Sequence, residues 1–71
     1  MSAAPKKVSE YLEELERDVE GKPDQVREGI EIYVGLWRKA LQKGVVSETD
    51  EVPAALAKVE ERGGLYKAAE D

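Results

Sequence analysis

The sequence predicts an all-α fold, a small three-helix bundle with its second helix (about residues 23–43) at the centre. Three segments carry apolar residues at helical spacing, and glycine or proline separates them. The outer two segments each present an apolar stripe about 100° wide, which is enough for one buried face. The middle segment presents an arc of about 200°, so it needs cover from two directions. The second helix is therefore expected to lie between the other two.

The first helix is expected over about residues 5–20, with Pro5 in its first turn. Its apolar stripe consists of Val8, Tyr11, Leu12, Leu15 and Val19. Gly21 ends the helix, and Lys22-Pro23 leads into the next one after a short turn. So short a connection makes the first and second helices antiparallel neighbours.

The second helix could instead be a strand, because residues 30–34 are rich in β-branched and aromatic side chains. Length decides for a helix, since the pattern runs for about five turns, from Pro23 to Gly44. Its main stripe consists of Val26, Ile30, Tyr33, Val34, Trp37, Ala40 and Leu41. Ile32 and Leu36 lie on an adjoining flank and widen the apolar arc.

Two glycines interrupt this second helix, each at a cost of about 1 kcal/mol relative to alanine. Gly29 borders the apolar arc, where a missing side chain lets another backbone come close. Gly35 projects from the polar side, and no physical reason for it is evident.

The third helix is expected over about residues 51–62, with Asp50 as N-cap and Pro53 in the first turn. A short turn from Ser47 could precede it. Its apolar stripe consists of Val52, Ala55, Leu56 and Val59. Gly63-Gly64 ends the helix, and Leu65-Tyr66 forms a short turn that folds back on the bundle. Residues 67–71 are expected to fray.

The whole chain, residues 1–71, is expected to form one domain, because it has no repeat, low-complexity segment or long linker. Its formal net charge of −5 disfavours nucleic acid and anionic membrane surfaces as partners. No apolar run approaches the length of a membrane span, and residues 1–5 lack the apolar core of a signal peptide. We therefore expect a soluble, cytoplasmic protein.

The residue types give no support for catalysis, a metal site or a cofactor. The chain has no cysteine and no histidine, so its serines lack a conventional activating base and the usual zinc ligands are missing. The acids Glu48, Asp50 and Glu51 do not follow the spacing of a calcium loop. No phosphate-binding glycine loop is present. We expect neither an enzyme nor a cofactor.

One motif points to another class of protein. The segment Ala40 to Ser47, followed by Val52 and Leu56, resembles the helix-turn-helix signature of DNA-binding regulators. The resemblance implies a regulator or accessory factor that binds DNA or, given the acidic charge, a basic protein. The sequence departs from the pattern by an extra valine before Ser47. Carboxylates also occupy residues 48, 50 and 51, where base and phosphate contacts would lie.

The wide apolar arc predicts a contact surface. If the outer helices both cover the main stripe, Ile32 and Leu36 stay exposed, and we expect an interface of Ile32, Leu36 and Trp37 with Tyr33 beside them. For Trp37 a place in the core is an open alternative, because aromatics at helical spacing are more often buried. The favoured function is therefore a small acidic interaction module that self-associates as a homodimer, or else binds a protein partner.

A role for charge in this dimer is also expected. The basic residues Arg38, Lys39 and Lys43 could meet first-helix carboxylates of a second copy, in an antiparallel, two-fold arrangement.

Overall fold

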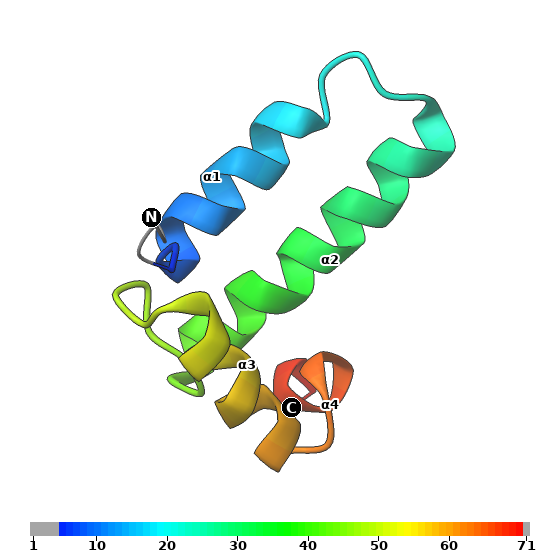
Figure 1. Cartoon of the computed structure of the whole chain (residues 1–71). Coiled ribbons are helices and arrows are strands. Elements are labelled where there is room, and N and C mark those ends of the chain that lie inside the picture. Colours follow the sequence, from blue (N-terminus) through cyan, green and yellow to red (C-terminus); the bar gives the residue numbers. More distant parts are fainter. Residues whose placement is uncertain (1–4, 71) are drawn as a thin grey trace.

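The computed structural model of the protein describes residues 5–70 and confirms the all-α fold. The described residues form four helices and no strand: α1 (Val8–Asp18), α2 (Asp24–Lys43), α3 (Val52–Glu61) and α4 (Leu65–Ala69). The helices α1 and α2 form an antiparallel hairpin, and α3 and α4 lie together at the end of it that holds the C-terminus of α2 (Figure 1). The turn of the hairpin passes through Gly21, whose φ of 81° is in the left-handed region.

The first helix begins later than the sequence suggested, at Val8 rather than near Pro5. Lys7 is extended and pairs with Glu51 in an isolated antiparallel bridge. The Val8 N–H donates to the Asp50 carbonyl (2.9 Å), and the Val52 N–H donates to the Lys6 carbonyl (2.8 Å). Pairing with a segment more than 40 residues away therefore holds the chain out of a helix before Val8, and it supplies acceptors for free N–H groups of both α1 and α3.

The start of α3 also differs by one residue. Glu51, not Asp50, is the N-cap, and Pro53 lies in the first turn as expected. The expected turn from Ser47 is present, closed by a 3.0 Å hydrogen bond from the Asp50 N–H to the Ser47 carbonyl. Gly44 ends α2 with φ 79°, and the pair Gly63-Gly64 follows α3 with φ 94° and 111°. Glycine at these positions avoids the steric cost of left-handed backbone.

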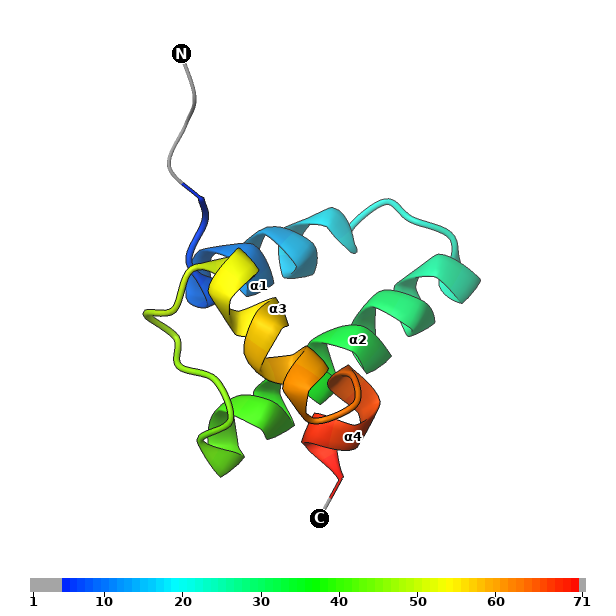
Figure 2. The same ribbon diagram turned by 60° about the horizontal axis from the view of Figure 1, so that its bottom comes forward.

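The C-terminal segment is more ordered than expected. Residues 67–70 do not fray: Lys67–Ala69 are helical, and Ala68 and Ala69 are buried; Asp71 lies outside the described residues. Helix α4 packs against α2 and α3 (Figure 2). Helices α1 and α4 thus pack against α2 but leave Ile32 of its apolar arc exposed, while α3 packs against α1 and α4. Ala68 and Ala69 have small side chains, which let the short helix α4 approach α2 and α3 closely.

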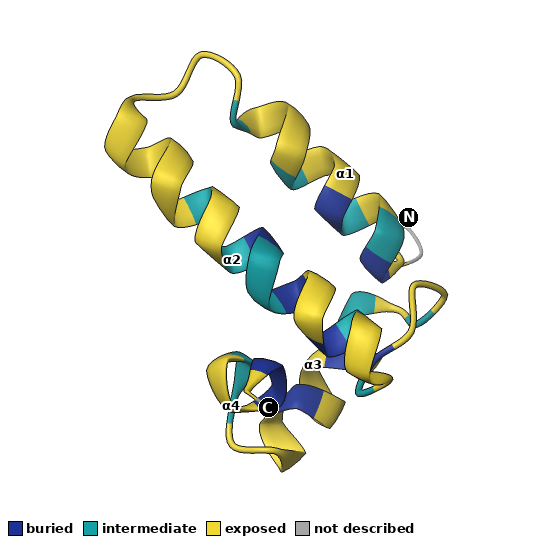
Figure 3. Ribbon diagram, turned by 180° about the vertical axis from the view of Figure 1, so that it is seen from behind, coloured by how far each residue is buried: buried dark blue, intermediate teal, exposed yellow. Residues whose placement is uncertain are grey.

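The hydrophobic core lies at the end of the hairpin where all four helices meet. Its buried residues are Val8, Leu12, Val34, Trp37, Ala40, Val46, Ala55, Val59 and Ala68. Toward the turn of the hairpin only α1 and α2 face each other, and most of the ribbon there is exposed (Figure 3). Residues 24–29 of α2 are all exposed, including the large apolar side chain of Val26. The first half of α2 is therefore packed on one side only.

Candidate interaction surface

Three apolar side chains form a surface on α2 and α4, which we call the α2/α4 surface: Ile32, Leu36 and Tyr66. Ile32 is 66 % exposed and Tyr66 is 68 % exposed, whereas Leu36 is half-buried. Ile32 and Leu36 share a face because they are four residues apart on one helix. Leu36 and Tyr66 line an open groove of about 250 Å³ together with Lys39, Ala69 and Glu70. The groove is thus lined by three apolar or aromatic side chains and by one charge of each sign.

The four residues predicted for the interface separate into two groups. Ile32 and Leu36 belong to the α2/α4 surface, but Trp37 is fully buried and Tyr33 is half-buried against the core. Trp37 therefore lies in the core, which was the alternative that the sequence left open. A partner molecule cannot touch Trp37 in this fold, so the interface hypothesis now rests on Ile32 and Leu36.

Sequence reasoning missed Tyr66 as a surface residue. It expected Leu65 and Tyr66 to fold back together, and only Leu65 packs against the core. The available signal was the apolar spacing from Leu65 to Ala68 and Ala69, which marks one buried face of a short helix and leaves Tyr66 off it.

An aromatic cluster joins the two long helices, α1 and α2. Tyr11, Tyr33 and Trp37 meet pairwise edge to face, with ring centroids 6.3 to 6.4 Å apart. Burial raises the pKa of Tyr11 to about 12, with a further contribution from its hydrogen bond to Tyr33. The Tyr11 hydroxyl is therefore protonated at neutral pH. The buried Trp37 Nε1 has no hydrogen-bond partner among the described residues.

Two of the basic residues predicted to contact a second copy, Arg38 and Lys39, have different surroundings in the single chain. Arg38 forms an ion pair with Glu16 on α1 of its own chain. Lys39 instead lines the groove beside Leu36. The contact predicted between Arg38 and a second copy would have to displace or extend the ion pair with Glu16.

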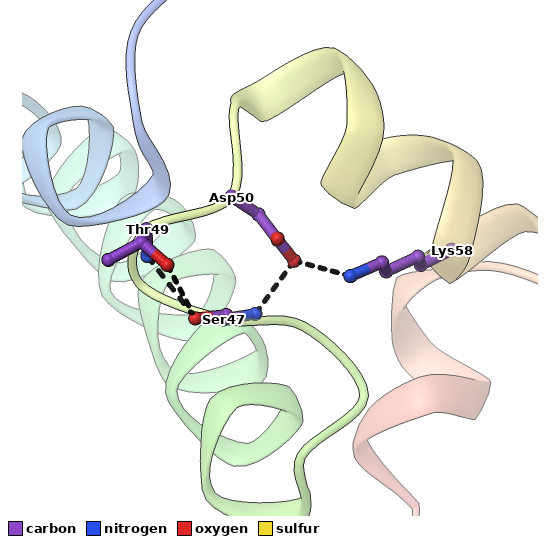
Figure 4. Close-up of polar contacts among 4 residues, drawn as sticks. All are labelled: Ser47, Thr49, Asp50 and Lys58. Atoms are coloured by element: carbon purple, nitrogen blue, oxygen red, sulfur yellow. Dashed lines mark hydrogen bonds and ion pairs between the residues drawn. The ribbon is translucent and has the colours of Figure 1, made fainter.

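A polar cluster joins the turn before α3 to Lys58 of α3 itself (Figure 4). The Asp50 carboxylate accepts a hydrogen bond from the Ser47 N–H (2.9 Å) and lies 2.8 Å from the Lys58 Nζ. The Lys58 ammonium and the Ser47 N–H together hold the pKa of Asp50 below its ordinary value. The Thr49 hydroxyl is 3.0 Å from that of Ser47. These contacts fix the turn that pairs with α1, so the cluster has a structural role.

The arrangement around Ser47 differs from a helix-turn-helix unit. Residues 44–51 separate α2 from α3, whereas such units join their helices by a turn of about three or four residues. Glu48 and Glu51 are exposed just before α3, where a recognition helix would present positive or neutral groups to DNA.

Across residues 5–70, no group of three or more Asp or Glu side chains is arranged to hold a metal ion. None of the helices described here is long and apolar enough to cross a membrane. Comparison with protein-family models, curated proteins and solved structures finds no match to this chain.

Proposed function

We propose that this protein is a non-catalytic, acidic helical module of the cytoplasm that acts by protein–protein contact, chiefly by self-association through the α2/α4 surface. The observation that carries the proposal is the exposure of Ile32, 66 %, on an ordered helix one turn from the Leu36 groove. Single exposed apolar residues are ordinary on protein surfaces. Here Ile32, Leu36 and Tyr66 adjoin along one face, and such patches mark contact sites.

Burial of this surface in a dimer would contribute to the free energy of association. Full burial of an isoleucine or leucine side chain contributes about 1.5–3 kcal/mol. In a two-fold dimer each residue of the surface contributes twice, once from each copy. The first part of α2 adds further surface, because residues 24–29 are all exposed.

The size of the chain supports the same proposal. A domain of 71 residues is close to the lower limit for a self-sufficient core, and association is one way in which small domains gain stability. The chain has no cysteine, so disulfides cannot supply that stability. The absence of cysteine also agrees with a reducing cytoplasm.

The proposal is tested by sedimentation equilibrium of the Ile32→Glu variant, with Gln42→Glu as a matched control. Both substitutions add one negative charge to an exposed position of α2, but Gln42 lies on the polar side away from Leu36. We expect Ile32→Glu to weaken self-association at least tenfold, since a buried carboxylate costs several kcal/mol, while the control associates as the unmodified protein does. Equal association of all three proteins would overturn the proposal.

A second candidate is an accessory factor that binds a basic protein, with DNA as the less favoured partner. The observation behind it is the exposed acidic face of α1, which includes Glu10, Glu13 and Glu14. A low-salt mobility-shift experiment with duplex DNA separates the two partners. We expect no shift, because the surface near α3 is acidic; a salt-dependent shift at micromolar protein would reverse this ranking.

A further inference from the structure

We infer that the occupant of the α2/α4 surface is the α2 helix of a second copy, packed antiparallel about a two-fold axis between Ile32 and Leu36. This inference rests on the proposed self-association and specifies its geometry. It is carried by the spacing of residues along α2, by two unpaired charges and by the uneven cover of the helix.

The residues on this side of α2 have the spacing of a helix–helix seam. Gln25, Gly29, Ile32, Leu36 and Lys39 follow one another at intervals of four, three, four and three. This alternation places the five residues on one narrow stripe, and Ile32 and Leu36, its large apolar members, lie next to each other at the middle of the stripe, where a partner helix would pack. All five residues are exposed or half-buried within the described chain. The seam is separate from the main stripe that faces α1, which ends in buried Trp37 and Ala40.

An antiparallel partner matches this seam residue by residue. With the axis between Ile32 and Leu36, Ile32 packs against Leu36 of the second copy and Gly29 lies opposite Lys39 of the second copy. A Cβ built at Gly29 meets no atom within 4 Å inside its own chain, so the fold of the single chain does not require glycine there. Close approach of a second helix does give a reason for it, since glycine lets backbones come together.

The charges beside the seam favour an antiparallel over a parallel arrangement of the two helices. Glu28 lies next to Gly29, and in the antiparallel arrangement it reaches Lys39 of the second copy. Neither Glu28 nor Lys39 has an ion-pair partner among the side chains of residues 5–70. Two-fold symmetry makes this pair twice. A parallel arrangement would instead place Lys39 against Lys39 and Glu28 against Glu28, and such like-charge pairs are destabilising.

The cover of α2 by α4 favours the same orientation. Helix α4 packs against α2 and lines the groove with Leu36 and Lys39, which lie in the second half of α2 (Figure 2). Residues 24–29 of the first half are uncovered. An antiparallel partner places the uncovered half of one α2 beside α4 of the other copy, where Tyr66 can pack on it. A parallel partner would bring the two α4 helices together and leave both uncovered halves without a neighbour.

Disulfide cross-linking tests this geometry, because the chain has no cysteine of its own. The variants Glu28→Cys and Lys39→Cys are prepared separately, mixed at equal concentration and oxidised with air or oxidised glutathione. We expect a disulfide-linked dimer in the mixture and none in either variant alone. At a rise of 1.5 Å per residue, two copies of the same position lie about 15 to 18 Å apart along the antiparallel axis, beyond the reach of a disulfide. A mixture of Glu31→Cys with Lys39→Cys is the control and should not cross-link, since Glu31 lies away from the seam.

A charge swap provides a second test that does not depend on cysteine. We expect Lys39→Glu to weaken the dimer about tenfold, because it replaces two attractive pairs by two repulsive ones. The double variant Glu28→Lys with Lys39→Glu should regain most of the affinity. Circular dichroism checks that each variant keeps its helix content.

The outcomes separate this inference from the proposed function. A disulfide formed by Glu28→Cys alone, or a dimer by mass that gives no cross-link in the mixture, would overturn the antiparallel seam and leave self-association standing. A monomer at every concentration would overturn both.

Discussion

The hydroxyl of Tyr11 on α1 lies 3.3 Å from the hydroxyl of Tyr33 on α2, and both rings meet Trp37 edge to face. This contact joins the two helices of the hairpin at the edge of the core. It occupies the side of α2 that points away from Ile32. The aromatic cluster thus covers one side of α2 within a single chain. The flank that carries Ile32 is not covered by it and can contact a second molecule.

The Tyr11 contact predicts a loss of stability at alkaline pH. The pKa of Tyr11 is about 12 in the folded chain, whereas an exposed tyrosine has a pKa of about 10. Between these values the folded state binds more protons than the unfolded state, so its stability falls as the pH rises from about 10 to 12. Urea unfolding followed across this range should show a steeper fall for the unmodified protein than for Tyr11→Phe. Parallel curves for the two proteins would contradict the assigned pKa.

Substitutions of Trp37 should separate its volume from its polar atom. Trp37→Ala should reduce the free energy of unfolding by about 3–5 kcal/mol, a large part of the stability of so small a domain. Trp37→Phe should cost much less, since it keeps a ring and removes an indole N–H that has no partner in the described structure. Urea denaturation measures both. Equal losses for the two variants would contradict the view that the ring volume of Trp37, and not its Nε1, stabilises the fold.

The Asp50–Lys58 contact predicts that the free energy of unfolding falls at acidic pH. The pKa of Asp50 lies below its ordinary value, so its contribution to stability is present above that value and is lost as the pH falls through the lowered pKa. Asp50→Asn should lower the melting temperature at pH 7 and remove part of the acid dependence. Lys58→Met should raise the pKa of Asp50, as NMR titration of the carboxyl group can measure. An unchanged pKa in that variant would exclude Lys58 as a cause.

Two glycines of the α2 region should respond to alanine in opposite directions. Gly44 has a φ of 79°, so Gly44→Ala should destabilise the fold by about 1–2 kcal/mol. Gly35 is inside the helix and a Cβ there meets no atom within 4 Å, so Gly35→Ala should stabilise it by about 0.5–1 kcal/mol. Thermal unfolding of both variants checks the pair. A loss of stability in Gly35→Ala would mean that position 35 has a function absent from the single chain.

The sequence predicted the positions of the helices well, because the residues that form a buried stripe or end a helix lie close together in the chain. The stripe through Leu12, the glycine that ends α2 at residue 44 and the pair Gly63-Gly64 all lie where the fold uses them. The three errors have non-local causes. Pro5 stays outside α1 because Lys7 pairs with Glu51. Asp50 is not the N-cap because its carboxylate binds Ser47 and Lys58.

The third error, at the C-terminus, shows the same limit. Ala68 and Ala69 are the only apolar residues among 67–70, and their small side chains gave too weak a signal to predict a helix buried against α2 and α3. For the candidate surface, the width of the apolar arc identified Ile32 and Leu36. It could not show that Trp37 is covered, since that depends on how α1, α3 and α4 surround it.

The central claim is that the chain self-associates, and its mass in solution tests this most directly. Light scattering after size exclusion, over a range of loading concentrations, should show the mass rising from the 7.9 kDa of one chain toward twice that value. A constant 7.9 kDa up to millimolar concentration would contradict the account.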